Sequence, residues 1–167
     1  MALFEPIFRA LDTAGVRYVT VGGVAVVLHG YARMTADLDL AVDLAAEPAA
    51  AAIEALTAIG FQPRAPVDAR DFADASARQR WIEEQGMTVF SMWDPNDPLR
   101  SVDLFLANPI DFEDLWANSE VVDLAGTPAR IASIPDLIRL KRIAARPLDL
   151  DDIQALEGIL AERQEGR

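Results

Sequence analysis

Two glycines and two aspartates in apolar surroundings constrain this chain more than any other feature. Gly22 and Gly23 close one apolar run, and Asp37 and Asp39 stand inside a second one, each followed by a leucine. Residues i and i+2 of a strand project from the same face, so both carboxylates share one side and both leucines share the other. The pattern predicts a strand that buries its leucines and presents its aspartates.

A cation and a phosphate are the ligands that suit this arrangement. Two adjacent carboxylates repel each other, and keeping both charged is costly unless a cation lies between them. A Gly-Gly turn at a helix start presents free backbone N–H groups, and without a Cβ the backbone can approach a phosphate closely. The two features together predict a site for a Mg²⁺–nucleoside triphosphate.

A third carboxylate stands alone in a later apolar segment. Asp103 lies in the middle of the run 101–106, which reads Ser-Val-Asp-Leu-Phe-Leu. A buried strand has little reason to hold a lone aspartate unless something compensates its charge. We therefore expect a group near Asp103 to compensate its charge.

The segment 16–44 resembles the nucleotidyltransferase superfamily that includes DNA polymerase β. That family combines a Gly-Gly or Gly-Ser turn, a helix, an Asp-x-Asp strand and a third carboxylate on a later strand. The longer pattern is similar to the small prokaryotic branch that includes nucleotidyltransferase toxins of the abortive-infection type. Its residues here are Gly22, Gly23, Ala25, His29, Gly30, Arg33, Thr35, Asp37 and Asp39.

The resemblance implies an α/β fold of the polymerase β-like nucleotidyltransferase type, a mixed sheet with flanking helices, followed by C-terminal helices. It implies transfer of NMP from an NTP to a hydroxyl of RNA, protein or a small molecule, with two Mg²⁺ ions. Membership of a toxin–antitoxin system, with an antitoxin or other protein partner, is a further implication.

The resemblance also assigns roles to residues. Asp37, Asp39 and Asp103 would be the catalytic, metal-binding carboxylates, and Gly22 and Gly23 would contact the β- and γ-phosphates. The family often has Ser where this chain has Gly23, so that hydroxyl contact is absent.

Two residues between the glycines and the aspartates have alternative roles. Arg33 would bind phosphate, or would form a salt bridge with one of the motif aspartates. Thr35 would belong to the nucleotide site, or would cap the strand or bond to the aspartates. His29, the only histidine, is expected to be structural, bonding a carbonyl at its helix end.

The segment from 136 to 153 resembles the C-terminal helix pair of the same branch. By that resemblance Lys141 faces the nucleotide phosphates, while Asp149 and Asp152 build the turn and cap the last helix. The alternative for Lys141, and the favoured one for Arg146, is a solvated basic face. Leu148 stands where the family often has Lys.

Composition excludes several classes of protein. The 167 residues carry a net charge of −12, which argues against broad nucleic-acid binding but not against RNA in a local basic groove. The absence of cysteine excludes disulfides, thiolate metal sites and Cys nucleophiles. No signal peptide or membrane span is expected, so the predicted location is the cytoplasm.

Hydrophobic periodicity predicts an α/β core over residues 1–132 and a C-terminal helical segment over 133–167 packed on it. Helices are expected over 2–14, 24–30, 48–59, 71–84, 109–118, 134–145 and 150–163. Strands are expected over 17–21, 36–44, 87–93 and 100–106, with a hairpin over 121–132. The least patterned part, 61–86, is expected to shape the acceptor side of the cleft.

Two other functions stay open at this point. The first is a catalytically inactive nucleotide- or partner-binding module of the same fold, for which the acidity would be the interaction surface. The second is a metal-dependent phosphohydrolase, for which the chain lacks the usual His and Asp clusters.

Overall fold

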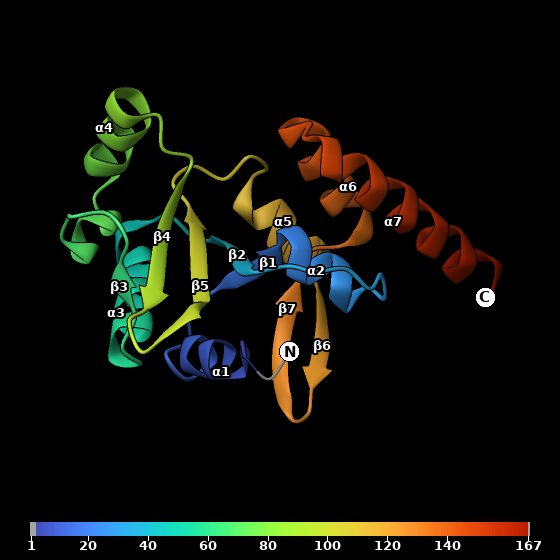
Figure 1. The fold of residues 1–167 in the computed structure, drawn as a ribbon, viewed down its shortest axis with the longest axis horizontal. Coiled ribbons are helices and arrows are strands. Elements are labelled where there is room, and N and C mark those ends of the chain that lie inside the picture. The colour runs from blue at the N-terminus through green and yellow to red at the C-terminus, as the bar shows by residue number, and fades with distance from the viewer. Residues whose placement is uncertain (1–2, 167) are drawn as a thin grey trace.

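A computed structural model describes residues 3–166, and a single mixed sheet runs through them with helices on both faces (Figure 1). The strand order is β3-β4-β5-β2-β1-β7-β6. The predicted α/β fold class is confirmed. The strands are β1 Tyr18–Val21, β2 Asp37–Val42, β3 Gln62–Pro63, β4 Val89–Asp94, β5 Asp97–Phe105, β6 Glu120–Leu124 and β7 Thr127–Ile131.

Every predicted helix is present, with shifts at its ends. The helices are α1 Glu5–Thr13, α2 Gly22–Leu28, α3 Ala46–Ala58, the 3₁₀ turn η1 Ala69–Ala73, α4 Ala75–Gln85, α5 Phe112–Asn118, α6 Ile134–Ala144 and α7 Pro147–Glu165. The prediction that α5 begins at Pro109 is wrong, because Asp111 caps the helix by accepting bonds from the N–H groups of Glu113 and Asp114.

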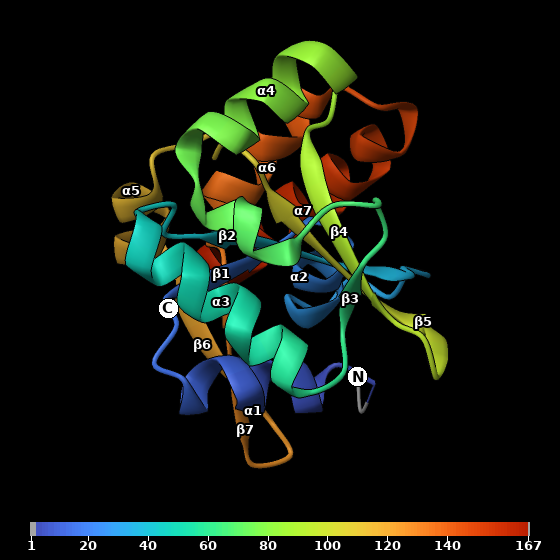
Figure 2. The same cartoon turned by 90° about the vertical axis from the view of Figure 1, so that its left-hand side faces the viewer.

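Alternation along the strands separates two apolar layers. Leu38 and Leu40 of β2 and Leu104 of β5 are fully buried among α1, α3, η1 and α4 on one face. Figure 2 shows α3 and α4 covering that face. Val21 and Ala41 belong to the second layer, under α2, α5, α6 and α7. The aspartates of β2 therefore lie on the face that the C-terminal helices cover.

The segment 61–86 does not have the predicted position. Trp81 of α4 stacks on Phe90 of β4 with ring centroids 5.3 Å apart, and Phe72 of η1 packs on the same ring at 5.5 Å. These contacts hold the segment on the face opposite the aspartates, because burying three aromatic rings outweighs its polar composition. Arg64, over the ring of Trp93 at 5.4 Å, lies close to the aspartate face.

The predicted boundary between residues 132 and 133 falls between β7 and α6. Leu137 and Ile138 of α6 and Leu156 of α7 pack with Val21 and Ala25 in the second layer. The division into a core and a helical segment stays a prediction. Within residues 3–166, no helix is both long and apolar enough to cross a membrane.

Candidate active site

Three strands place polar side chains side by side in the middle of the sheet. Strands β2 and β5 are parallel, and their register sets Asp39 beside Asp103 and Asp37 beside Ser101. The antiparallel neighbour β4 sets Ser91 on the other side of Asp103, and the Ser91 side chain bonds to that carboxylate. Residues paired across adjacent strands share a face, so the predicted convergence of the three aspartates on one face is confirmed.

The carboxylates of this row are held at an electrostatic cost. Burial, followed by the charges of Asp103 and Asp37, raises the pKa of Asp39 to about 6. Burial also raises the pKa of Asp103, against a bond from Ser91 that lowers it. The ionised row is therefore less stable than the same carboxylates in water, and a cation bound there would offset that cost.

The donor set of this row fits Mg²⁺. Aspartate oxygens are the ligands this ion prefers, and the repulsion within the row is what a divalent cation relieves. Among residues 3–166, no three acidic or histidine side chains are already arranged around a common ion position.

The glycine turn packs directly against this row. Gly22 has a φ of +61°, a conformation that favours glycine, and an added Cβ there would overlap the carboxylate of Asp39. An added Cβ at Gly23 would overlap the side chains of Thr35 and Arg33. Both glycines are required by close approach, and α2 begins at this turn as the pattern predicts.

Lys141, the chain's only lysine, is buried in a network of charges. Its side chain is 4% exposed, and its Nζ lies 3.3 Å from Asp149 and 2.5 Å from Asp152. Asp149 also accepts the backbone N–H of Arg146 at 3.0 Å and so caps α7, as predicted. A solvated basic face is therefore excluded for Lys141. Although its side chain borders the site, its charge is already compensated.

Arg33 joins the same network. Its Nε lies 3.3 Å from Asp152, and neither motif aspartate is its ion-pair partner, so the predicted alternative pairing is wrong. The cause is tertiary, because α7 brings Asp152 to the segment between α2 and β2. Asp152 thus connects α6, α7 and the segment that contains Thr35 and leads to Asp37.

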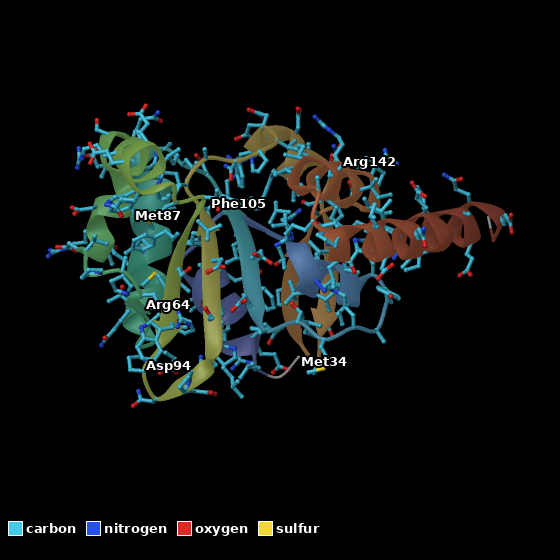
Figure 3. The ribbon with its side chains drawn as sticks, turned by 45° about the horizontal axis from the view of Figure 1, so that its top comes forward. Met34, Arg64, Met87, Asp94, Phe105 and Arg142 are labelled. Carbon is cyan, nitrogen blue, oxygen red and sulfur yellow. The ribbon has the colours of Figure 1, made fainter. Side chains whose placement is uncertain are left out.

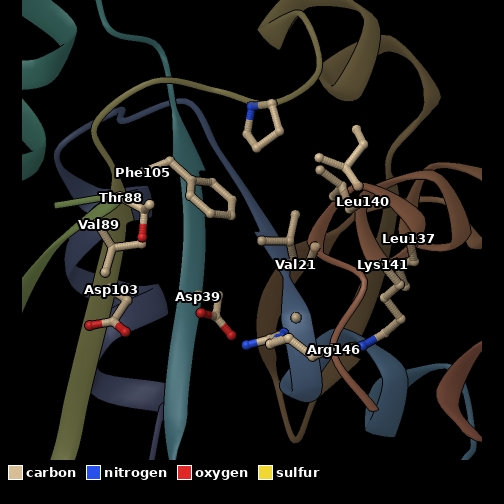
Figure 4. Close-up of a pocket in the computed structure, with 14 residues that line it drawn as sticks. Val21, Asp39, Thr88, Val89, Asp103, Phe105, Leu137, Leu140, Lys141 and Arg146 are labelled. Atoms are coloured by element: carbon tan, nitrogen blue, oxygen red, sulfur yellow. The ribbon is translucent and has the colours of Figure 1, made fainter. Parts of the chain in front are cut away.

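A cavity of about 370 Å³ lies between the carboxylate row and α6 (Figure 4). Asp39 and Asp103 line one side, and Leu137, Leu140 and Lys141 line another. Arg146 points toward Asp39, and its charge lowers the pKa of that carboxyl.

Arg146 is the site residue that sequence reasoning missed. As expected, its side chain is solvated, being 68% exposed, but it also borders the cavity at the corner between α6 and α7, directly before Pro147. Its one sequence signal is Asp149 three residues later, which accepts the backbone N–H and two guanidinium N–H groups of Arg146.

His29 is structural, as expected, but its partner differs. Its Nε2–H donates to the carbonyl of Ala132 at 2.8 Å, at the end of β7 rather than in its own helix. Its Nδ1 accepts from Arg163 of α7 at 3.2 Å. Burial lowers the pKa of His29, consistent with a neutral ring that fastens α2 to the C-terminal helix.

Two glycine variants separate backbone strain from damage to the site. Gly15 and Gly22 both have positive φ, but only Gly22 faces the Asp39 side chain. We expect Gly15→Ala and Gly22→Ala each to lower the free energy of unfolding by about 1–2 kcal/mol. Only Gly22→Ala should also weaken the Mg²⁺–NTP binding that the sequence predicts, by about tenfold or more, because its Cβ displaces the Asp39 carboxylate. Urea denaturation and calorimetry measure the two effects, and equal nucleotide binding by both variants would contradict the assignment.

The raised pKa of Asp39 predicts a pH-dependent gain in stability for Asp39→Asn. Between the ordinary value of 3.8 and about 6, the folded state binds more protons at this site than the unfolded state. Stability contributed by Asp39 therefore falls as pH rises through that window. Without metal, Asp39→Asn should raise the free energy of unfolding by about 2 kcal/mol near pH 7.5, relative to the unmodified protein. Near pH 4 the substitution should change it little. Thermal denaturation at both pH values tests this, and a loss of stability near pH 7.5 would refute it.

Lys141→Met tests whether the ion pairs of Lys141 stabilise the folded protein. Removing it leaves Asp149 and Asp152 buried without their main cation, so we expect a loss of about 3–5 kcal/mol of unfolding free energy. The matched control is Arg142→Met, because Arg142 pairs with Glu157 on the surface and is 63% exposed. That variant should change stability by no more than about 0.5 kcal/mol. Equal free energies of unfolding for the two variants in chemical denaturation would contradict a structural role for Lys141.

Comparisons with known proteins find similarity in structure rather than in sequence. No protein-family model matches the chain, and no curated protein matches it. The crystal structure of ANT(2″)-Ia in complex with adenylyl-2″-tobramycin aligns with a TM-score of 0.62 at 16% identity, covering 98% of this chain and 91% of that one.

Two further structures are similar over most of their length. The lincosamide antibiotic adenylyltransferase LnuA, with lincomycin bound, has a TM-score of 0.63 at 17% identity and covers 95% of this chain and 97% of its own. An antigenic nucleotidyltransferase-like protein from Paracoccidioides brasiliensis has a TM-score of 0.54 at 15% identity, covering 99% and 87%. At these identities the likeness establishes the architecture, and the chain has the polymerase β-like nucleotidyltransferase fold.

Proposed function

We propose that this protein is a Mg²⁺-dependent nucleotidyltransferase that moves NMP from an NTP to a hydroxyl group of a small molecule. The observation that carries the proposal is the register of β2 and β5, which sets Asp39 beside Asp103 at the edge of a cavity. The glycine turn lies against the same carboxylates, so phosphate and metal would meet there.

The reaction forms one O–P bond and breaks another. The acceptor oxygen attacks the α-phosphorus, the bond from that phosphorus to the α–β bridging oxygen breaks, and pyrophosphate leaves. Asp103 would receive the hydroxyl proton and pass it to solvent, because its carboxylate lies beside Asp39 at the edge of the cavity. When bound, Mg²⁺ neutralises the charge of the triphosphate and acidifies the attacking hydroxyl.

The chain's own residues have separate roles in this proposal. Asp37, Asp39 and Asp103 would hold two metal ions, and the backbone at Gly22 and Gly23 would contact the triphosphate. Arg146 would bind a phosphate, because its guanidinium points into the cavity beside Asp39.

Lys141 and Arg33 would act mainly through Asp152. The lysine and Asp152 are almost fully buried, and both cations share that carboxylate. Their role is to hold the segment that carries Thr35 against Gly23. Direct phosphate contact by Lys141, Arg33 or Thr35 stays a prediction of the sequence resemblance.

The structural neighbours favour a small-molecule acceptor. One was solved with adenylyl-2″-tobramycin, and another is an antibiotic adenylyltransferase solved with lincomycin. RNA and protein acceptors, and a toxin or antitoxin role with a protein partner, rest on the sequence resemblance alone and stay predictions.

The test combines nucleotide binding with transfer. Each of the four NTPs is titrated by calorimetry with and without Mg²⁺, and α-labelled NTP is then incubated with lincomycin, tobramycin or total RNA. We expect Mg²⁺-dependent binding, and a loss of about a hundredfold or more in transfer for Asp39→Asn and Asp103→Asn. Asp151→Asn is the control, since Asp151 is exposed on α7 and does not line the cavity.

Absence of Mg²⁺-dependent NTP binding in the unmodified protein would refute the enzyme proposal. It would leave the non-catalytic binding module, which would then be sought through co-purifying proteins. Binding without transfer to any of the three acceptors would instead retain the nucleotide site and reject these acceptors.

A further inference from the structure

The lining of the cavity changes from carboxylates to apolar side chains within two residues along the strands. Phe105 follows Asp103 by two residues on the same face of β5, and Val89 of β4 pairs with Phe105. Both side chains line the cavity. In Figure 3 Phe105 lies at the opposite end of the β4–β5 pair from Arg64 and Asp94. The β4–β5 side of the cavity, which we call its floor, therefore carries carboxylates at one end and apolar side chains at the other.

The wall opposite this floor is also apolar. Leu137 and Leu140 of α6 line it (Figure 4). Ile143 of α6 and Pro109, between β5 and α5 in the chain, also line the cavity. Ile143 is 59% exposed, so the apolar surface continues to the mouth of the cavity. We call this part, made of Val89, Phe105, Pro109, Leu137, Leu140 and Ile143, the apolar chamber.

Charge around the chamber excludes cationic ligands. Four charged residues line the cavity, namely Asp39, Asp103, Lys141 and Arg146. Both carboxylates are assigned to the metal ions in the proposed function, Lys141 is already paired with Asp149 and Asp152, and Arg146 is positive. An ammonium group in the chamber would lose its hydration without gaining a carboxylate partner.

The chamber also fits a nucleobase poorly. A base carries several ring and exocyclic groups that need hydrogen-bond partners when buried. Among the uncharged lining side chains, only Thr88 offers a hydroxyl. An alkyl or other apolar body leaves no such group unpaired, and the cavity volume suits one small molecule.

We infer, building on the proposed function, that the apolar chamber binds the uncharged, apolar body of a hydroxyl-bearing acceptor and discriminates against cationic acceptors. The hydroxyl of such a molecule would lie beside Asp103, two residues from Phe105 on β5.

A matched pair of probes tests the charge selectivity. Hexyl β-D-glucoside and 6-aminohexyl β-D-glucoside carry the same sugar hydroxyls and differ by one terminal ammonium group. Their dissociation constants are measured by saturation-transfer NMR or calorimetry with Mg²⁺ present throughout, first without and then with NTP. We expect the uncharged glucoside to bind about tenfold more tightly or better. Equal or tighter binding of the amine, or no binding of either, would overturn the inference.

A matched pair of variants locates the binding. Ile143→Asp places a carboxylate at the chamber mouth, while Leu150→Asp makes the same change at a 65% exposed leucine that does not line the cavity. Ile143→Asp should weaken binding of the uncharged glucoside about fivefold or more, and the variant should bind the cationic glucoside more tightly than the uncharged one. Leu150→Asp should change neither. Both substitutions are at exposed positions, and thermal melting verifies their folding.

Two outcomes separate this inference from the proposed function. If Ile143→Asp weakens binding of Mg²⁺–NTP more than binding of the glucoside, the apolar chamber holds the nucleobase. The inference then fails, while the nucleotide site of the proposed function is retained. If the glucoside binds with the expected selectivity but no NTP binds with Mg²⁺, the chamber stands and the proposed function fails.

Discussion

The pairing of β2 with β5 is the constraint on which the site depends. The two strands run parallel in the centre of the sheet, and their register brings Asp39 beside Asp103 although 64 residues separate them in the chain. Each aspartate is followed by a fully buried leucine, and these leucines pack on the other face. A slip of one residue in either strand would exchange carboxylates and leucines between the faces, so core packing and site assembly are enforced by the same alternation.

The carboxylate row shows how the fold tolerates an unfavourable cluster. Burial and mutual repulsion raise the pKa of Asp39, yet the row lies between strands that are already fixed by the apolar layer behind them. Stability elsewhere offsets the local cost, as is common at sites that await a ligand. The same repulsion that disfavours the ionised row favours a cation there, which links local instability to the proposed chemistry.

The C-terminal helices contribute to the site through buried charge as well as apolar packing. Asp152 lies beside both Lys141 and Arg33, while Asp149 accepts the backbone N–H of Arg146 at the start of α7, and the Arg146 side chain borders the cavity. Removing one member of such a network leaves its partners uncompensated, so the relative positions of α6, α7 and the segment before β2 are strongly specified. The wall of the apolar chamber thereby keeps its position relative to the carboxylates.

The local sequence pattern predicts the strands near the site, the glycine turn and the shared face of Asp37, Asp39 and Asp103. It does so because alternation of apolar and polar residues, and glycines that allow close backbone approach, can be recognised from neighbouring residues. Three features were decided only by tertiary structure. The segment 61–86 packs on the back face because Phe72 and Trp81 meet Phe90 there. Arg33 pairs with Asp152 rather than with a motif aspartate, and Arg146, although exposed to solvent as predicted, also lines the cavity. Each of these depends on contacts between residues distant in the chain, and periodicity indicates which face a residue occupies but not which distant element covers that face.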